Sequence, residues 1–225
     1  MAFHDGLGQR LTTQEPGGGQ IDLLRLRADL ASVPSFEFAL RERVNRLASF
    51  RHPSFALVRR VERQGAEAVV TVVSEHADGV RLADLLDEAE RRHLPPDLSA
   101  TLCLIRQLVP SVAILHEAAR DVAHGAIAPE RLVVTAQARL IVTDYALGSA
   151  LEQLLYARDR YWTDLRVPLP RAAGLARFDQ GADVLQVGVV ALSLLLGRRL
   201  KDAEHGAALA DLVTSARAVA GGREL

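Results

Sequence analysis

The stretch from His124 to Asp144 places the narrowest limits on what this chain can fold into. It begins with a turn-rich loop that contains Pro129, and two short apolar runs follow, Leu132 to Val134 and Leu140 to Val142. Two runs of this length joined by a short polar tip predict a β-hairpin. Because Asp144 follows the second run after one residue, Thr143, the sequence predicts a carboxylate at the end of a strand.

The bulk composition is that of an ordinary globular protein. With 225 residues, 49% of them hydrophobic, the chain can bury a sizeable core in one domain or in two small lobes. Its net charge of −1 argues against a nucleic-acid partner, because such proteins usually present a basic face. The single cysteine, Cys103, excludes an internal disulfide and a metal site built from cysteines, which fits a reducing compartment.

We expect no membrane segment in this chain and a cytoplasmic location. The N-terminus, Met1 to Gly6, lacks the charged and then apolar pattern of a signal peptide. The longest apolar run, Val184 to Leu196, contains Gln186 and Gly188 and is short for a membrane span. This run is typical of a buried core helix.

Outside the predicted hairpin, periodicity predicts strands in the first third of the chain and mainly helices in the rest. The exception is the segment from Gly148 to Pro170, which has no strong periodicity. Strands are expected at Ile21 to Leu26, at Phe55 to Arg63 and at Glu67 to Ser74. Helices are expected to open at Pro34 and end before Phe50, to run from Arg81 to Arg92, from Pro95 through Leu115 with a kink at Pro110, from Gly181 to Leu196 and from Ala207 to Ala218.

The loop and hairpin resemble the catalytic and metal-binding loops of eukaryotic-type protein kinases, and among these the bacterial Ser/Thr kinases. That family's pattern is His-Arg-Asp, any residue, Lys-Pro-Glu-Asn, and then Asp-Phe-Gly one hairpin later. Here the same frame holds His124 to Arg131, and then Asp144 to Ala146. The order and spacing of the other elements agree with the family from Ile21 to about Leu200.

The resemblance implies an α+β, protein kinase-like bilobal fold. We expect a small β-rich N-terminal lobe at residues 1–76 and a partial helical C-terminal lobe at residues 77–225 that is truncated after its central helix. In this family Asp183 would brace the backbone of the catalytic loop and His124 would be mainly a packing residue. We expect the chain to be part of a longer multidomain protein.

The N-terminal lobe lacks the family's phosphate-binding lysine. The matching position is Leu24, or Arg25 after a slip of one residue, since strand faces alternate. The only lysine in the chain is Lys201, far downstream. Either Glu42 or Arg43 would occupy the place of the glutamate that pairs with that lysine, and without a lysine Glu42 is expected to be a solvated surface charge.

The catalytic loop keeps one of the groups on which phosphoryl transfer depends. The position of the proton-accepting base is Ala126, and that of the loop lysine is Ala128. Arg131 places a cation where the family holds its second metal ion. Asp144 remains, either as a magnesium ligand or as a cap of the following turn. The degenerate positions are therefore Leu24, Ala126, Ala128 and Arg131.

Nucleotide-binding positions follow from the same resemblance. The segment from Ser74 to Gly79 matches the hinge, with Ser74 behind the nucleotide pocket and the backbone of Glu75 and Ala77 facing an adenine edge. A plain strand-to-helix turn is the alternative. Gly6 and Gly8 stand where a glycine-rich phosphate loop would lie, without its third glycine. The candidate nucleotide contacts are Ser74, Glu75, Ala77, Arg131 and Asp144.

We interpret the sequence as a pseudokinase, that is, a kinase-like domain without catalysis that acts as a regulatory or protein-interaction module in a bacterial cytosol. Protein partners are expected. We expect no firmly bound cofactor and at most weak binding of ATP with magnesium. Two alternatives stay open. One is an atypical nucleotide-dependent transferase or weakly active Ser/Thr kinase that uses Asp144, and the other is an unrelated α+β domain.

Overall fold

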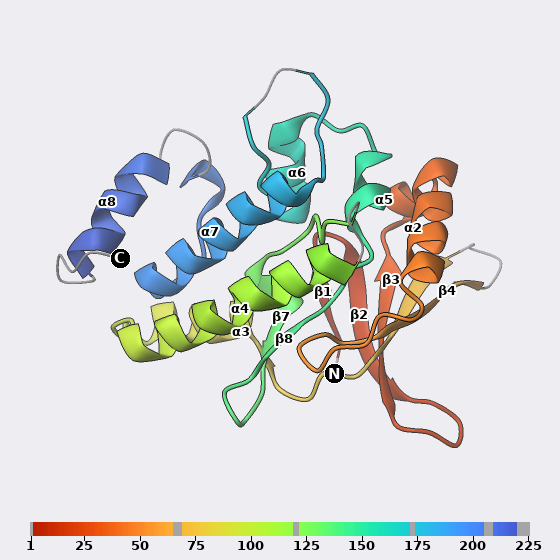
Figure 1. Cartoon of the computed structure of the whole chain (residues 1–225), viewed down its shortest axis with the longest axis horizontal. Helices are drawn as coiled ribbons and strands as arrows, with labels where there is room; N and C mark the ends of the chain where they lie inside the picture. Colours follow the sequence, from red (N-terminus) through yellow and green to blue (C-terminus); the bar gives the residue numbers. More distant parts are fainter. Residues whose placement is uncertain (1, 65–68, 119–121, 172–173, 205–208, 220–225) are drawn as a thin grey trace.

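The computed structural model describes residues 2–64, 69–118, 122–171, 174–204 and 209–219. Figure 1 shows an antiparallel sheet with one flanking helix at one end of the molecule and a group of helices at the other. A small second sheet lies between them. We call the two ends the N-terminal and C-terminal lobes.

The N-terminal lobe is built on a five-stranded antiparallel sheet with the strand order β1-β2-β3-β5-β4. The strand register shows which of Leu24 and Arg25 faces the core at the position of the family's lysine. Leu24 lies opposite Val72 and is buried, whereas Arg25 lies opposite Thr71 and is exposed. The strands are β1 (Ala2–Asp5), β2 (Gly8–Gln14), β3 (Gln20–Leu26), β4 (Val58–Gln64) and β5 (Val69–Glu75).

Helix α2 (Pro34–Arg46) packs against this sheet, after the short helix α1 (Ala28–Ala31). Proline is well suited to the first helical position because its missing N–H has no helical partner there. The helix buries an apolar face that includes Phe36, Leu40 and Val44. The predicted helix is confirmed.

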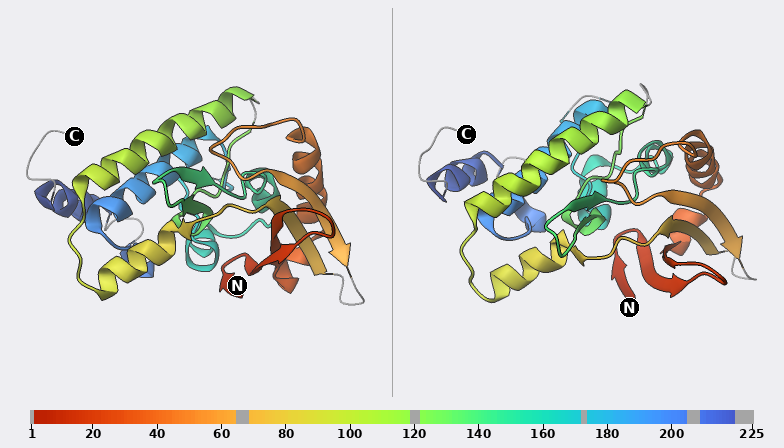
Figure 2. Two further views of the ribbon diagram at one scale, coloured as in Figure 1. Left: turned by 90° about the horizontal axis from the view of Figure 1, so that it is seen from below. Right: turned by 60° about the horizontal axis from the view of Figure 1, so that its bottom comes forward.

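The C-terminal lobe is organised around two apolar helices, α4 (Leu98–Ala118) and α7 (Gln180–Leu196), which lie side by side (Figure 2). Helix α7 begins with a cap in which the Asp179 side chain accepts the N–H of Ala182 at 3.0 Å, and it ends at Gly197 with φ 67°. Glycine favours such a left-handed end. Helices α3 (Leu82–Arg91) and α8 (Leu209–Val219) complete this lobe.

Helix α4 is long and apolar enough, by length and composition alone, to cross a membrane. Its Leu108, Val112 and Leu115 are nevertheless buried in the main core, together with residues of both lobes. One face of α4 therefore packs against the core, while Val109 on another face is exposed. Helix α7 likewise buries Val190 and Leu194, as its apolar sequence predicted.

The second sheet contains the predicted hairpin. Strands β7 (Leu132–Val134) and β8 (Leu140–Val142) pair antiparallel, and the two-residue strand β6 (Val80–Arg81) pairs with β7. A single 3-10 turn, η1 (Pro129–Arg131), leads into β7. The segment expected to begin a strand at Phe55 instead bridges to Val142 of β8, and β4 starts later, at Val58.

Two helices lie in the stretch that showed no periodicity. They are α5 (Gly148–Glu152) and α6 (Arg158–Leu165), and a further 3-10 turn, η2 (Asp202–Glu204), follows α7. One helix of five residues and one of eight give too few turns for a periodic pattern to stand out. Tertiary burial defines α6 instead, through Tyr161, Trp162 and Leu165.

Candidate functional site

The loop from His124 to Arg131 is held from behind by α7. The Asp183 carboxylate accepts the N–H of His124 at 2.7 Å and that of Gly125 at 2.6 Å, and His116 Nε2 lies 2.7 Å from the same carboxylate. Gln186, one turn further along, accepts the N–H of Ile127 at 2.8 Å. All of these loop groups are buried, so each would be costly to leave without a partner. The expected bracing role of Asp183 is confirmed.

His124 is fully buried and ties the loop to the strand that ends at Asp144. Its Nε2 lies 2.8 Å from the Thr143 carbonyl oxygen, while its Nδ1 accepts the N–H of Ala126 at 3.2 Å. This pattern places the proton on Nε2, where it can be donated to the carbonyl. Burial lowers the pKa of His124, so the ring is neutral. His124 is therefore a packing and positioning residue, as expected.

The loop lacks space for an arginine side chain after the histidine. Gly125 has φ 72°, and a β-carbon there would lie 2.4 Å from the α-carbon of Gly148. A β-carbon on Gly148 would in turn meet the carbonyl oxygens of Ala123 and His124 at 2.9 Å. The catalytic-like loop and the start of α5 thus touch through their backbones, and both positions require glycine.

The turn between β1 and β2 satisfies its own backbone donors with a carboxylate. Asp5 accepts the N–H groups of Leu7 and Gly8 at 2.9 and 3.2 Å. The turn also presses against α6, since a β-carbon on Gly6 would lie 2.0 Å from the carbonyl oxygen of Asp164. In the kinase resemblance this turn would cover nucleotide phosphates. Here its N–H groups are already bonded to an anion of the chain itself.

Asp144 forms an ion pair with an arginine of the β1–β2 hairpin. Arg10 NH2 lies 2.7 Å from Asp144 Oδ2, and Arg10 Nε donates to Asp5 Oδ2 at 2.7 Å. These side chains are only 14% exposed for the arginine and 5% for each aspartate. Burial alone would lower the pKa of Arg10, but Asp144 and Asp5 outweigh it and raise the pKa. Burial likewise opposes ionisation of Asp5, yet Arg10 and Arg131 hold its pKa below the ordinary value.

Arg131 occupies the second metal-ligand position and acts as a bridge inside the cleft. Its guanidinium donates to the carbonyl oxygen of Ala126 at 3.1 Å and to that of Leu165 at 2.7 Å. Burial lowers its pKa, and the nearby carboxylates Asp5 and Glu130 oppose this shift. Arginine retains its charge in proteins. A permanent cation therefore joins the catalytic-like loop to the end of α6.

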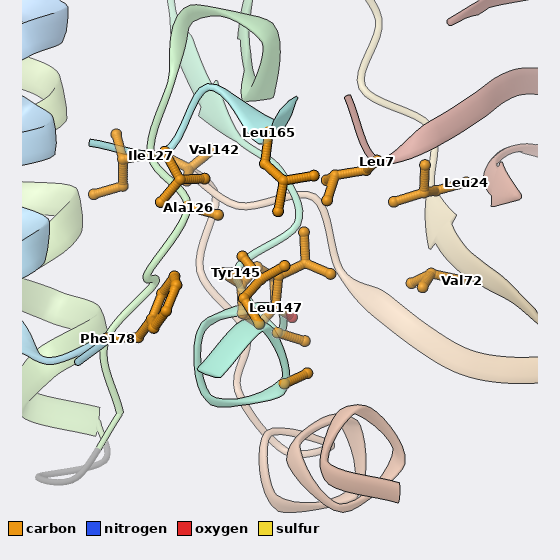
Figure 3. Close-up of a cluster of buried hydrophobic side chains, with 14 of the residues drawn as sticks. Leu7, Leu24, Val72, Ala126, Ile127, Val142, Tyr145, Leu147, Leu165 and Phe178 are labelled. Carbon is orange, nitrogen blue, oxygen red and sulfur yellow. The ribbon is translucent and has the colours of Figure 1, made fainter. Parts of the chain in front are cut away.

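Apolar side chains fill the space beside this ion network. Leu7 at the hairpin tip is fully buried in the main core, and it lies between Leu24 of β3 and Leu165 of α6 (Figure 3). Ala126 and Ala128 are buried and carry no group that could accept or donate a proton from its side chain. Leu24 faces the core at the lysine position. The network Asp5, Arg10, Arg131 and Asp144, together with Leu7, is called the cleft plug below.

On α2, Glu42 and Arg43, the two candidates for the place of the family's ion-pairing glutamate, differ in burial. Glu42 is exposed, as expected for a surface charge, whereas Arg43 is 5% exposed. The Arg43 guanidinium donates to the carbonyl oxygens of Ala123 and Tyr145, the latter at 3.3 Å. Burial lowers the pKa of Arg43 to about 10, and the more distant Asp183 opposes this. An arginine thus ties α2 to the C-terminal lobe from the face where the family has a glutamate.

The hinge residues lie on one segment, and the N–H groups of Glu75 and Ala77 have partners within the chain. The N–H of Glu75 donates to the Leu57 carbonyl oxygen at 2.8 Å, and the N–H of Ala77 donates to Asp22 Oδ2 at 3.3 Å. Asp22 also contacts His76 Nδ1 at 2.9 Å. Ser74 is buried in the sheet opposite Asp22. The structure brings Arg131 and Asp144 together, but in the plug rather than with these hinge groups.

The residues present do not fit a magnesium–nucleotide complex. Asp144, the one retained metal-ligand position, faces Arg10, and the described residues contain no group of three acidic, histidine or cysteine side chains suited to a metal ion. The turn that would cradle phosphates is bonded to Asp5. A bound nucleotide would have to displace the plug. Arg10 and Asp5 thus decide what this cleft can hold, and no sequence motif pointed to either residue.

Comparisons with known proteins agree with the fold. No protein-family model matches the chain. A probable serine/threonine-protein kinase of Streptomyces coelicolor is 27% identical over 136 residues, which is 60% of this chain and 19% of that protein. CBL-interacting protein kinase 16 of Oryza sativa subsp. japonica is 33% identical over 140 residues, 60% of this chain and 26% of that protein. The chain thus spans about a fifth to a quarter of the length of these curated relatives.

Solved structures extend the similarity to almost the whole chain. The kinase domain of maize SIRK1, solved with AMP-PNP bound, has a TM-score of 0.73 at 20% identity and covers 99% of this chain and 76% of that one. The kinase domain of Mycobacterium tuberculosis PknI has a TM-score of 0.67 at 18% identity, with 92% and 75% covered. The chain therefore has the protein kinase fold and is related in sequence to Ser/Thr protein kinases, as its loops indicated.

Proposed function

We propose that this chain is a pseudokinase that works as a regulatory or protein-interaction module in a bacterial cytosol. One observation carries the proposal above the others. The only retained catalytic group, Asp144, is ion-paired with Arg10 inside the buried cleft plug. A group held in this way is not free to coordinate a metal ion, and the cleft in front of it is filled.

The loss of chemistry is cumulative. A general base contributes about a hundred- to ten-thousand-fold to a rate, and charge stabilisation is usually the larger effect. Ala126 supplies no base, Leu24 supplies no phosphate contact, and Arg131 would repel a metal ion. Groups that act together in catalysis do not contribute additively. Turnover by the chain as it stands is therefore expected to be negligible.

The test is a phosphate-transfer assay together with a nucleotide-binding thermal shift, each with and without magnesium. The wild-type chain should show neither label incorporation nor a magnesium-dependent shift in melting temperature. Ala126→Asp alone should behave like the wild type, because the plug and the other replacements remain. Label incorporation that disappears in Asp144→Ala would overturn the proposal and favour a weakly active kinase or an atypical transferase.

A repaired variant measures how far the cleft has departed from an enzyme. It combines Leu24→Lys, Ala126→Asp and Arg131→Asn with Arg10→Ala, which frees the Asp144 carboxylate. We expect this variant to gain magnesium-dependent nucleotide binding if it folds, as judged by circular dichroism. The other three changes without Arg10→Ala form the matched control, in which Asp144 stays paired and binding should be weaker.

A further inference from the structure

A cavity of about 540 Å³ has the hinge in one of its walls, and none of the plug residues lines it. Its walls come from three parts of the chain: the connection between α2 and β4, the hinge, and the β7–β8 hairpin. This volume falls within the range of about 300–1,000 Å³ that is common for ligand sites. We call it the back groove. Its floor is formed by the half-buried side chains of Phe50 and Ile141, with the buried rings of Phe55 and Tyr145 beneath.

The floor is apolar and held in one arrangement. Phe50, Phe55 and Tyr145 pack edge to face, with ring centroids 5.0 to 5.4 Å apart. The Tyr145 hydroxyl accepts the N–H of Val58 at 3.2 Å, which fixes the ring. The N–H of Ala56 donates to the Val142 carbonyl oxygen at 3.0 Å, so the connection is attached to β8. A ligand would not have to order these groups, which lowers the entropic cost of binding.

One wall of the groove offers hydrogen-bond donors without a carboxylate partner. Arg51 NH1 donates only to the backbone oxygens of Ala48 and Phe50, at 2.7 and 2.9 Å, and across the described ranges no carboxylate pairs with it. The neighbouring His52 accepts the N–H of Ser54 at its Nδ1, 3.2 Å away. The proton of its ring is therefore on Nε2, which has no hydrogen-bond partner in the described part of the chain.

The hinge wall has the opposite charge. Asp78 is exposed and makes no ion pair or hydrogen bond with the residues that the structure describes, and Glu75 is held by Arg59 at 3.3 Å. The lining thus presents a cation from the α2–β4 connection and an anion from the hinge, together with the apolar floor. Charges of both signs do not suit a polyanion. They suit a ligand whose own charges alternate in sign along its length.

We propose that the back groove binds an extended peptide segment of a partner protein, with one apolar side chain on the floor, an acidic side chain at Arg51 and a basic side chain at Asp78. Alternate residues of an extended chain face the same way, so the three anchors are positions one, three and five of the segment. The apolar anchor supplies most of the affinity, and the charges supply direction and selectivity. This inference rests on the proposed role of the chain as an interaction module.

The test uses a capped pentapeptide, Glu-Thr-Leu-Thr-Lys, titrated into the uniformly labelled chain while its amide signals are followed by NMR. Saturable shifts are expected to cluster in residues 50–57, 75–78 and 135–141. Replacing the peptide's leucine by alanine should abolish saturation, and this change leaves the protein untouched. The peptide Gln-Thr-Leu-Thr-Gln should bind about fivefold more weakly, in line with exposed ion pairs.

A charge reversal makes the test specific. Arg51→Glu should weaken binding of the glutamate peptide about fivefold and strengthen binding of Lys-Thr-Leu-Thr-Lys by a similar factor. The matched control is Arg106→Glu, an exposed arginine of α4 outside the groove, which should change neither affinity. Amide dispersion of each variant verifies that it is folded.

Three results would overturn the proposal. They are shifts scattered over the surface, equal binding of the neutral peptide, and an unchanged preference in Arg51→Glu. Shifts of the same amides that depend on protein concentration without peptide would assign the groove to a second copy of this chain instead. The titration contains neither nucleotide nor magnesium, so its failure would leave the outcome of the phosphate-transfer test untouched.

Discussion

The two sides of the loop from His124 to Arg131 differ in what has been kept. Behind the loop, Asp183 and Gln186 hold its backbone through four hydrogen bonds of 2.6 to 3.1 Å. In front of it, alanine side chains replace the chemical groups, and arginines fill the cleft. Compared with the kinase pattern, the loop has the backbone contacts on which the core depends and lacks the chemical groups of that pattern.

The difference shows that fold and chemistry are supported by different interactions in this molecule. Contacts behind the loop satisfy buried backbone groups, so losing them would destabilise the whole lobe. Groups in front of the loop would serve a ligand, and their loss can be tolerated if the vacated space is filled. The cleft plug does this through Leu7 and the paired charges of Arg10 and Asp144.

The largest effect is expected behind the loop. Asp183→Ala leaves the N–H groups of His124 and Gly125 buried without an acceptor, and each such group costs roughly 1–3 kcal/mol. Together with the loss of the His116 contact, the free energy of unfolding should fall by about 4 kcal/mol. Denaturant unfolding measures this. Asp159→Ala, on the exposed side of α6, is the control and should change stability by less than about 0.5 kcal/mol.

The next largest effect concerns the charges of the plug. Arg10→Met leaves Asp5 and Asp144 buried beside each other with Arg131 as their remaining cation, and should cost about 3 kcal/mol at neutral pH. Because the folded pKa of Asp5 is lowered from 3.8, its ionisation stabilises the wild type fully above that value, and this contribution is lost as the pH falls through the folded pKa.

The deficit of Arg10→Met should therefore shrink between pH 7 and pH 3, as the carboxyl groups of the variant become protonated. Stability measured at several pH values for wild type and variant gives this difference directly. Arg106→Met, which removes an exposed arginine, is the control and should give a difference that does not change with pH. A deficit that stays constant with pH would show that packing, and not charge, closes the cleft.

A smaller loss of folding stability is expected from a change at Leu7, the apolar residue of the cleft plug. Leu7→Ala removes a fully buried side chain between the lobes, and such a truncation typically costs about 2–3 kcal/mol when the surroundings partly close the cavity. The variant should also make the amides of Gly8 and Leu165 exchange faster, since both border the vacated space. If stability falls without faster exchange at Leu165, Leu7 serves only the sheet and does not hold the lobes together.

The smallest effect on stability is expected on α2, where two neighbouring residues can be compared. Glu42→Ala should change stability by less than about 0.5 kcal/mol because the side chain is exposed. Its neighbour Arg43 bonds carbonyl oxygens of Ala123 and Tyr145, so Arg43→Met should cost clearly more. Thermal unfolding of the two variants side by side decides this, and equal melting temperatures would mean that Arg43 does not join the lobes.

Elements with strong local patterns could be predicted from the sequence. The hairpin after Arg131 and the apolar helices follow from residue periodicity, and the loop frame follows from the kinase resemblance. Helices α5 and α6 could not be predicted in this way, because they are short and are defined by burial against α2 and the core. The degenerate catalytic positions could be identified from the sequence, but the side chains that occupy the cleft beside them could not.

The plug itself left no local signal in the sequence. Arg10 and Asp144 are separated by more than a hundred positions, and nothing in either neighbourhood indicates that the two side chains meet. The alternation of strand faces left Leu24 and Arg25 as alternatives, and only the pairing with β5 decided between them. Such long-range pairings depend on how the lobes close, which periodicity does not describe.

The close contact of Gly6 with Asp164 also bears on the order in which the chain folds during synthesis. The β1–β2 turn leaves the ribosome before the segments against which it packs, which emerge about 160 residues later. At the usual speeds of about 5–20 residues per second, the turn waits many seconds for its partners. Docking of the hairpin against the end of α6 then has to follow the synthesis of α6. A turn that can form early reaches its native packing only after a segment far along the chain exists.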